Sequence, residues 1–247
     1  MSLILKDLCK QYDNSEAATL HKINLEIKNG EFMCIVGASG CGKSTLLNLV
    51  AGLEEPTGGK ILLDGEEIHG PGADRVVMFQ EHGLFPWLTV IENVRFGMEL
   101  AGVDKEEQER KADYYLEMMH LQDYRDYRIH QISGGMRQRV ALARALTLDS
   151  RVLLMDEPFS ALDKQTSNRL REELQRIWQE TKRTILFITH SVEEAVYLAD
   201  RIVALSPTTG EIAGIKEVNL ERPRHVYAPE FVDIRHEILE LVRGEAV

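Results

Sequence analysis

The stretch GASGCGKST, residues 37–45, decides the fold of this chain. It follows an apolar, strand-like run at residues 32–36 and precedes a leucine-rich segment at residues 44–51 that is typical of a helix. A glycine-rich turn in this setting can direct its backbone N–H groups around phosphate oxygens, and the helix start adds a partial positive charge. The sequence therefore predicts a phosphate-binding P-loop for a nucleoside triphosphate.

Each residue of this loop is a candidate contact for the nucleotide. Lys43 is expected to reach the β and γ phosphates, and the hydroxyl of Ser44 is placed to bind Mg²⁺. The alternative is a glycine-rich turn with a chance Lys-Ser pair, and the flanking strand and helix count against it. The predicted nucleotide contacts of the loop are Gly37, Ala38, Ser39, Gly40, Cys41, Gly42, Lys43, Ser44 and Thr45.

A second apolar run, VLLM at residues 152–155, ends in the acidic pair Asp156 and Glu157. Asp156 is expected at the carboxyl end of a buried strand, where it would hold the same Mg²⁺ directly or through water. Glu157 would leave the strand end beside the γ phosphate, which predicts a general base that deprotonates the attacking water. The alternative for Glu157 is a carboxylate that only supports the metal ion or caps a helix.

A third motif, ISGGMRQRVALARAL at residues 132–146, has a Ser-Gly-Gly turn that opens a long helix. Ser133 and the N–H groups of Gly134 and Gly135 are free to face a phosphate, as at other helix starts. The chain thus carries two phosphate-facing helix starts and one lysine-bearing loop.

The third motif lies between the other two in the sequence. With these motifs the chain resembles the ATP-binding subunits of ABC transporters, and the resemblance runs over nearly its whole length. The resemblance implies ATP and Mg²⁺ as cofactors. It also implies a head-to-tail dimer of two copies, in which the Ser-Gly-Gly helix of one subunit closes on the ATP held by the P-loop of the other. The implied activity is ATP hydrolysis that powers transport through a membrane permease, with a solute-binding protein as an indirect partner.

Further residues match elements of this family in the expected order. By the resemblance, Gln80 contacts Mg²⁺ and links the site to the membrane partner, and His190 is a catalytic switch histidine at the γ phosphate. Asp163, in the stretch SALD, resembles the acid of a loop that crosses the dimer, and Tyr12 the aromatic residue that stacks on adenine. Taken alone, Gln80 could be a surface residue, His190 a capped and solvated histidine, and Tyr12 an ordinary strand residue.

The signature differs from the commonest family pattern, which has Leu before the serine and Gln after the second glycine. These positions hold Ile132 and Met136. Ile132 keeps an apolar anchor, whereas Met136 removes a polar side chain near the partner's nucleotide. Because Ser133 and both glycines remain, we expect the phosphate contact to survive.

Strand-like and helical segments alternate along the chain, which predicts an α/β fold with a mostly parallel sheet. The family resemblance implies a P-loop NTPase core with an antiparallel β portion near the N-terminus and an inserted helical subdomain. We expect one ABC ATPase domain over residues 1–247, with its core at about 1–89 and 149–210, helices at about 90–148, and a C-terminal strand and helix at about 211–247. The predicted strands are residues 3–8, 23–27, 32–36, 61–63, 76–79, 152–155, 184–188 and 201–205.

The net charge of −11 argues against the broad basic surface of a nucleic-acid binder. The charge-dense stretch at residues 104–113 is expected to be a solvated helix face. Cys9, Cys34 and Cys41 suit reduced thiols in the cytosol. Because no run approaches the roughly 18 apolar residues of a membrane span, the pore must come from another polypeptide, and the chain is expected as a peripheral subunit at the cytoplasmic face of the cell membrane.

The segment EHGLFPWL, residues 81–88, places Phe85 and Trp87 in a loop. The resemblance puts this loop in the groove that receives a helix of the membrane subunit; the alternative is that both rings pin the helical lobe to the core. This loop, the Ser-Gly-Gly-Met signature and the sequence Arg222-Pro223-Arg224 resemble the importers of nitrate, sulfonate and taurine. A small anion or sulfonate-type solute is therefore expected.

Three other functions compete with import. An exporter or a lipid-transport system shares the mechanism, because the membrane subunit sets the direction of transport. A soluble ABC ATPase that acts on nucleic acid or the ribosome usually has two cassettes or long coiled-coil insertions, and the sequence shows neither. An unrelated P-loop kinase or GTPase would leave the helix start at Ser133 and the residue His190 without a role.

Overall fold

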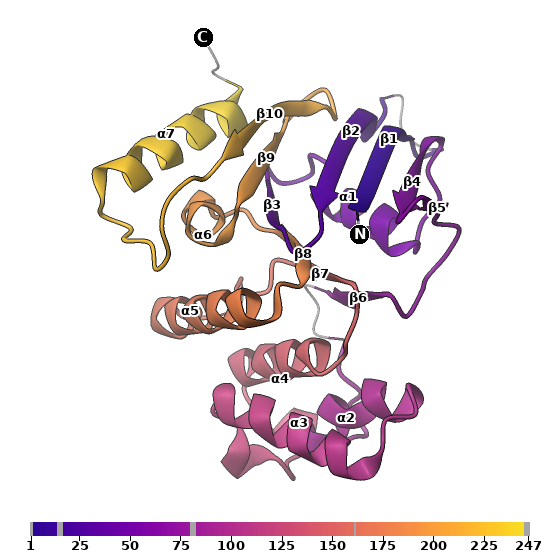
Figure 1. The fold of residues 1–247 in the computed structure, drawn as a ribbon, viewed down its shortest axis with the longest axis vertical. Coiled ribbons are helices and arrows are strands. Elements are labelled where there is room, and N and C mark those ends of the chain that lie inside the picture. The colour runs from indigo at the N-terminus through magenta and orange to yellow at the C-terminus, as the bar shows by residue number, and fades with distance from the viewer. Residues whose placement is uncertain (1, 14–16, 80–82, 161, 245–247) are drawn as a thin grey trace.

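The computed structural model describes residues 2–13, 17–79, 83–160 and 162–244. Figure 1 shows one lobe built on two β-sheets and a smaller lobe of helices, which is referred to below as the helical lobe. The helical lobe consists of α2 (Val90–Leu100), α3 (Lys105–Met118) and α4 (Gly134–Leu146), with 3-10 turns at Gln122–Tyr124 and Ile129–Gln131. No helix in the described part of the chain is long and apolar enough to cross a membrane.

The larger sheet, over the described residues, has its strands in the order β10-β9-β3-β8-β7-β6. These strands are β3 (Phe32–Val36), β6 (Arg75–Met78), β7 (Val152–Asp156), β8 (Thr184–Ile188), β9 (Arg201–Leu205) and β10 (Ile212–Glu217). Neighbouring strands are parallel except for β10, which runs antiparallel to β9. Strands β3, β7 and β8 are buried at every residue, as expected where both faces of a parallel sheet are covered.

The smaller sheet is antiparallel and has the order β2-β1-β4-β5. Its strands are β1 (Ser2–Lys10), β2 (Leu20–Lys28), β4 (Gly58–Leu63) and β5 (Glu66–Glu67). Buried and exposed residues alternate along β2, because this sheet buries one face and leaves the other to solvent.

Helix α1 (Lys43–Ala51) packs into the apolar layer that joins the two sheets. One cluster contains Leu5 of β1, Leu47 of α1 and Leu154 of β7, all nearly or fully buried. Burying a leucine of this kind stabilises the fold by about 1.5–3 kcal/mol. The hydrophobic core therefore fixes α1, and with it the loop from which α1 begins.

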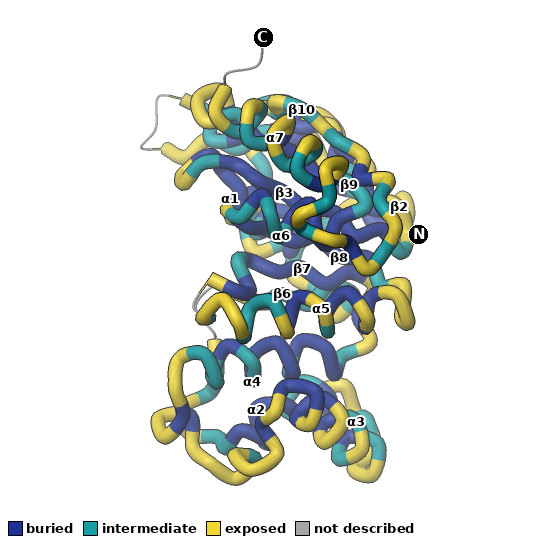
Figure 2. Tube along the Cα trace, turned by 90° about the vertical axis from the view of Figure 1, so that its left-hand side faces the viewer, coloured by how far each residue is buried: buried dark blue, intermediate teal, exposed yellow. Residues whose placement is uncertain are grey.

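The opposite face of the larger sheet carries α5 (Lys164–Thr181), α6 (Val192–Leu198) and α7 (Pro229–Arg243). Figure 2 shows the buried strands of this sheet in dark blue, with exposed yellow residues along the outer sides of the helices. Helix α7 buries Phe231 and Ile238 completely. The helix predicted near the C-terminus is thus present, and it packs on the core.

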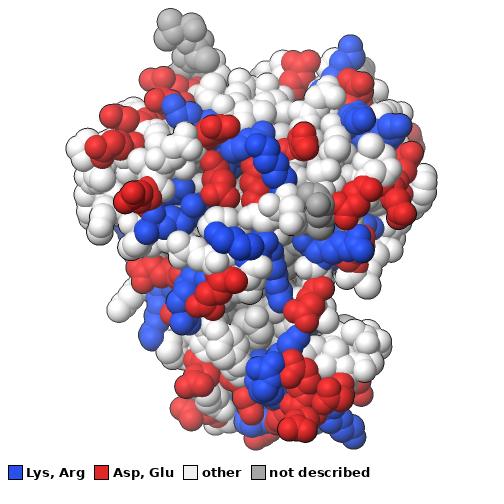
Figure 3. Space-filling view, viewed as in Figure 1, with Lys and Arg blue, Asp and Glu red and all other residues white. Residues whose placement is uncertain are grey.

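The predicted fold class is confirmed, and every predicted strand is present. The strand predicted at residues 3–8 is longer in the structure, where β1 extends from Ser2 to Lys10. Helix α4 begins at Gly134 within the predicted Ser-Gly-Gly turn, because the Ser133 side chain caps it. The stretch at residues 104–113 forms most of α3, whose acidic and basic side chains pair with each other and with neighbours such as Arg95 and Arg125. Figure 3 shows such mixed charge over the helical lobe at the bottom of the view.

Arg224 is a buried arginine that joins the end of α6 to the chain after β10. Its guanidinium donates to the carbonyl oxygens of Val196 (2.7 Å), Ala199 (2.7 Å) and Val218 (2.9 Å), and its side chain is surrounded by protein. Burial, together with the charge of nearby Arg222, lowers the pKa of Arg224 to about 10. The arginine that helped to indicate the importer subfamily therefore has a structural role.

We predict that Arg224→Met destabilises the protein by about 3 kcal/mol, because the substitution leaves several buried carbonyl groups without donors. The matched control is Arg176→Met on α5, where the arginine is exposed and pairs with Glu173 on the same helix; a loss below about 1 kcal/mol is expected there. Urea unfolding of both variants measures the difference. Equal losses of stability in the two variants would show that the hydrogen bonds of Arg224 contribute no more than an exposed ion pair.

Candidate active site

The loop at residues 37–45 connects β3 to α1, and its shape requires glycine at two positions. Gly40 and Gly42 have φ values of 81° and 99°, in the region that other residues rarely adopt. A Cβ atom on Gly42 would also lie 2.8 Å from Leu20 Cδ2 and 3.0 Å from the carbonyl oxygen of Thr19. The start of α1 therefore lies against the start of β2, and Gly40 and Gly42 line a cavity there.

Lys43 is buried beneath this loop, although its side chain carries a charge. Its Nζ atom donates to the carbonyl oxygens of Gly37 (2.9 Å) and Ala38 (2.8 Å). The loop thus folds around the ammonium group. A cavity of about 380 Å³ opens beside it, lined by Thr19, Ser39, Gly40, Gly42, Lys43, Ser44, Thr45, Glu157 and His190.

Asp156 ends β7 beside Ser44, as the sequence predicted. The Ser44 side chain is hydrogen-bonded to the Asp156 carboxylate, while the Oδ1 atom of that carboxylate is buried without a partner among the described groups. Burial raises the pKa of the Asp156 carboxyl; the Ser44 hydrogen bond lowers it, and the charge of Glu157 raises it. A carboxylate oxygen open to coordination next to a hydroxyl is a set of hard oxygen ligands, so these residues fit Mg²⁺.

Glu157 and His190 meet at the edge of the cavity. Glu157 Oε2 lies 3.0 Å from His190 Nδ1, and the Glu157 side chain is only 17% exposed. The backbone of Glu157 is left-handed, with φ at 47°, and it is held by the Ile188 carbonyl oxygen, the Gln138 amide and the Ser160 hydroxyl. Because this strained conformation is fixed on several sides, it turns the carboxylate toward the cavity.

The second predicted phosphate site lies apart from this cavity. Ser133 caps α4, and its hydroxyl accepts a hydrogen bond from the N–H of Met136 at 3.3 Å. Ser133 and Gly134 are exposed, and a Cβ atom on Gly134 would meet nothing within 4 Å. Since neither residue nor Gly135 lines the cavity at Lys43, the structure does not bring the two helix starts together within one chain.

The remaining predicted site residues divide into three cases. Asp163 caps α5, where its carboxylate accepts from the N–H of Thr166; hydrogen bonds from the side chain and then from the N–H of Thr166 lower its pKa. Tyr12 follows β1 and is partly exposed; its hydroxyl donates to Glu54 Oε2 at 2.7 Å and lies 3.3 Å from Thr45 Oγ1. Tyr12 is therefore anchored beside the loop. Gln80 lies outside the described residues.

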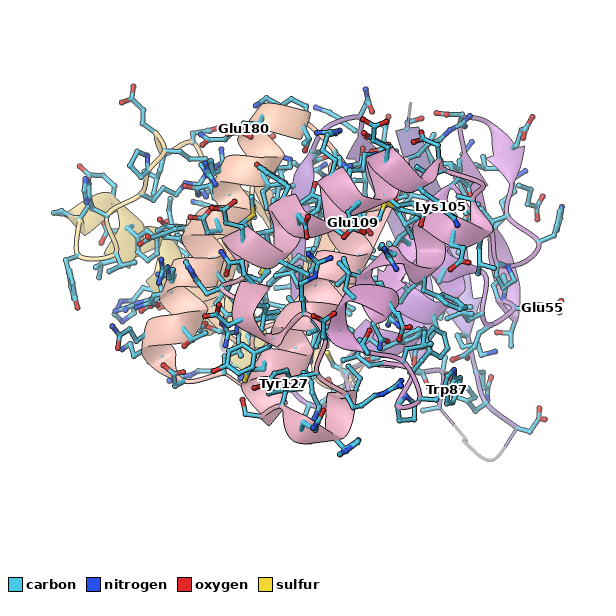
Figure 4. All side chains as sticks on the ribbon, turned by 90° about the horizontal axis from the view of Figure 1, so that it is seen from below. Glu55, Trp87, Lys105, Glu109, Tyr127 and Glu180 are labelled. Carbon is cyan, nitrogen blue, oxygen red and sulfur yellow. The ribbon has the colours of Figure 1, made fainter. Side chains whose placement is uncertain are left out.

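The aromatic loop, residues 83–88, was expected either to lie in the groove that receives a helix of the membrane subunit or to pin the helical lobe to the core. Phe85 is half-buried, and its ring centroid lies 4.3 Å from that of Phe96 on α2. Trp87 lies 5.4 Å from Phe85 but is 67% exposed; it projects from the margin of the helical lobe in Figure 4. Phe85 thus pins the loop to the helical lobe, whereas Trp87 faces solvent.

Sequence reasoning missed Thr19, which lines the cavity just before β2. Thr19 belongs to no motif, and packing of Gly42 against it brings it to the cavity. The pairing of Glu157 with His190 was also missed, because it depends on the left-handed backbone at residue 157. One signal in the sequence could have indicated this pairing: Glu157 and His190 are titratable residues that each follow a predicted strand, and the ends of adjacent parallel strands lie close together.

A glycine loop and an acidic pair at the ends of parallel strands place the protein among the P-loop nucleoside triphosphatases. The family described as ABC transporter matches residues 20–160, more than half of the chain. The chain belongs to this family, as the sequence resemblance implied, and it is an ATP-binding subunit with ATPase activity.

Named relatives and solved structures agree. The nitrate import ATP-binding protein NrtD of Synechocystis sp. is 47% identical, with 99% of this chain and 96% of the relative covered. The taurine import ATP-binding protein TauB of Pseudomonas putida is 43% identical, with 97% and 95% covered. A dimeric structure of a bacterial ABC transporter cassette superposes with a TM-score of 0.80 at 31% identity, covering 89% of this chain and all of that one.

We predict that Gly42→Ala weakens ATP binding at least tenfold, because the added Cβ strains a left-handed residue and meets the backbone of Thr19. Gly65→Ala is the matched control: φ at Gly65 is 87°, but a Cβ there meets nothing within 4 Å. Both variants should lose about 1 kcal/mol of stability from the backbone strain. Calorimetric titration with ATP and Mg²⁺ should separate them; unchanged affinity in Gly42→Ala would contradict the close approach.

Proposed function

We propose that this chain is the ATPase subunit of a solute importer, and that ATP brings two copies together head to tail. The observation that carries the proposal is the separation of the two helix starts. Ser133 lies on an exposed surface away from the cavity at Lys43. A phosphate held at Lys43 can therefore meet a Ser133 helix start only if a second copy supplies it. The dimeric cassettes to which this chain is similar support the same arrangement.

The proposed chemistry distributes charge around the phosphates. Loop N–H groups would bind the β and γ phosphates, and Lys43 would exchange its bonds to the loop carbonyls for phosphate oxygens. Ser44 and Asp156 would hold Mg²⁺, with Gln80 as the further ligand that the family resemblance implies. When bound, the ion supplies positive charge that offsets the charge of the phosphates.

Glu157 would then act as the general base on the attacking water, with its carboxylate oriented by His190 at 3.0 Å. The helix-capping alternative for Glu157 does not fit, because α5 and α6 are capped by Asp163 and Ser191. His190 is 64% exposed at its side chain, so it can also reach the γ phosphate. Tyr12 would stack on adenine after leaving its bond to Glu54.

The partners follow from the named relatives. Both NrtD and TauB are named as import proteins, which favours import over export and a small anion such as nitrate or a sulfonate as the solute. We propose that the pore belongs to membrane permease subunits, that a solute-binding protein acts on them, and that this chain binds them as a peripheral subunit at the cytoplasmic face. The whole chain would form one ABC ATPase domain with the boundaries given above.

Replacing Glu157 with Gln should leave ATP binding intact and lower turnover by about 10² or more, because the water loses its base. The variant should also accumulate as a dimer in ATP and Mg²⁺, since hydrolysis no longer separates the copies. Phosphate release and light scattering measure the two effects. Glu180→Gln, on the exposed surface of α5 (Figure 4), is the control and should behave as the parent protein. Parental turnover in Glu157→Gln would remove the assignment.

Trp87→Ala should weaken recovery of the permease about tenfold or more, because an exposed tryptophan that docks into a partner contributes about 2 kcal/mol or more. ATPase activity of the subunit alone should stay within about twofold. The control variant is Leu100→Ala, which also removes an exposed apolar side chain, in this case from α2. Tagged protein is recovered from detergent-solubilised membranes of its source. Equal recovery with both variants would place the permease contact elsewhere.

A further inference from the structure

The aromatic loop, residues 83–88, follows a strand of the core but is fastened to the helical lobe. Asn93 of α2 binds the backbone of Phe85 on both sides: it accepts from the N–H at 2.8 Å and donates to the carbonyl at 3.1 Å. Arg128 donates to the Trp87 carbonyl oxygen. Arg144 of α4 donates to the Gly83 carbonyl oxygen at 2.9 Å. Each side-chain hydrogen bond that described residues make to this backbone therefore comes from the helical lobe.

Arg144 makes a second contact with the same loop. The centre of its guanidinium lies 5.6 Å from the centroid of the Phe85 ring, within the range of a cation–π interaction. That ring also packs against the rings of Phe96 and Trp87. Arg144 is half-buried, and burial lowers the pKa of its guanidinium. One side chain thus holds both the backbone and the central ring of the loop.

Helix α4 joins this contact to the second phosphate site. Ser133 caps its first turn, and Arg144 lies in its last turn, about 16 Å further along at the usual helical rise. Val140 and Leu142 between them are buried in the core of the helical lobe. A helix packed in this way moves as one body, because its interior hydrogen bonds resist bending over such a length. A displacement at Ser133 therefore reaches Arg144.

We propose that Arg144 is a positioning residue that fixes the aromatic loop to α4, so that engagement of Ser133 by a nucleotide is passed to Trp87. The inference rests on the proposed function, since it needs ATP to reach Ser133 from a second copy. It adds a specific element to that function: the guanidinium at the end of α4 connects the phosphate-facing start of the helix to the loop that bears the exposed tryptophan.

A simpler role for Arg144 is a favourable charge at the carboxyl end of α4. Such a cation contributes about 0.3–1 kcal/mol to helix stability, and lysine supplies it as well as arginine. The planar guanidinium is different, because it can donate to a carbonyl and lie over a ring at the same time, which an ammonium cannot reproduce. Arg144→Lys therefore separates the two roles: it keeps the charge and loses the combined contact.

Hydrogen exchange in the Glu157→Gln background, with and without ATP and Mg²⁺, tests the inference. With Arg144 present, ATP should slow amide hydrogen exchange at residues 37–45 and at residues 133–136. It should also slow exchange about fivefold at residues 83–88, since closure reduces local opening. In Arg144→Met the first two effects should remain, while the effect at 83–88 falls below twofold. Arg144→Lys should keep the thermal stability of the parent and show an intermediate effect at 83–88. Arg110→Met on α3, where the arginine is exposed, should leave all three effects unchanged.

The outcomes separate the two proposals. An equal response at residues 83–88 in the Arg144, Arg144→Lys and Arg144→Met proteins would overturn the role of Arg144, as would no response there while 133–136 is protected. No protection at 133–136 in the parent would instead show that the head-to-tail dimer fails. If Arg144→Met does not fold, the comparison of Arg144→Lys with the parent decides, since a pure helix-end charge predicts identical exchange in both.

Discussion

The site depends on the parallel pairing of three adjacent strands, β3, β8 and β7. Their register aligns Ile35 with Ile188, and Ile188 with Asp156. Parallel strands end at the same edge of a sheet, so the residues that follow them converge there. The glycine loop, Glu157 and His190 are distant in the sequence, and they share one cavity because each follows one of these strands.

Burial of α1 adds a second constraint to this edge. The helix packs between the sheets through residues such as Leu46 and Leu49, both almost fully buried. Its first turn cannot move away from β2 or β3 without exposing that apolar surface. The packing of α1 therefore holds the backbone of the loop in place. Such preorganisation is what makes electrostatic stabilisation of phosphate charge effective.

Much of this arrangement could be predicted from the sequence, because it rests on local patterns. Apolar runs ending in Gly37 or in Asp156 specify buried strands whose ends carry function, and Ser133 before Gly134 specifies a capped helix. The contacts of Thr19 and the pair formed by Glu157 and His190 could not be predicted. They depend on a left-handed backbone and on packing between segments far apart in the chain, and no local pattern encodes either.

The starts of α1 and α4, for which phosphate contacts are proposed, show how similar backbone chemistry can lie in different surroundings. At α1 the loop wraps a buried Lys43 beside a cavity, whereas at α4 the capping hydroxyl of Ser133 lies on an open surface. An exposed helix start alone binds an anion weakly, because water competes for its N–H groups and screens its dipole. The start of α4 gains strength only when another surface covers it and excludes that water.

Two segments connect the helical lobe to the core, and they differ in the contacts that hold them in place. At the returning connection, Asp149 pairs with Lys111 of α3 at 2.6 Å and with Arg183 before β8 at 2.8 Å. Arg183 also donates to the carbonyl oxygens of Leu146 and Leu148, so this connection is tied to lobe and core together. The outgoing segment at residues 83–88 is held by side chains of the lobe. The helical lobe can therefore turn as a rigid body about the returning connection. The outgoing segment turns with the lobe, so that the exposed face of Trp87 moves with α4.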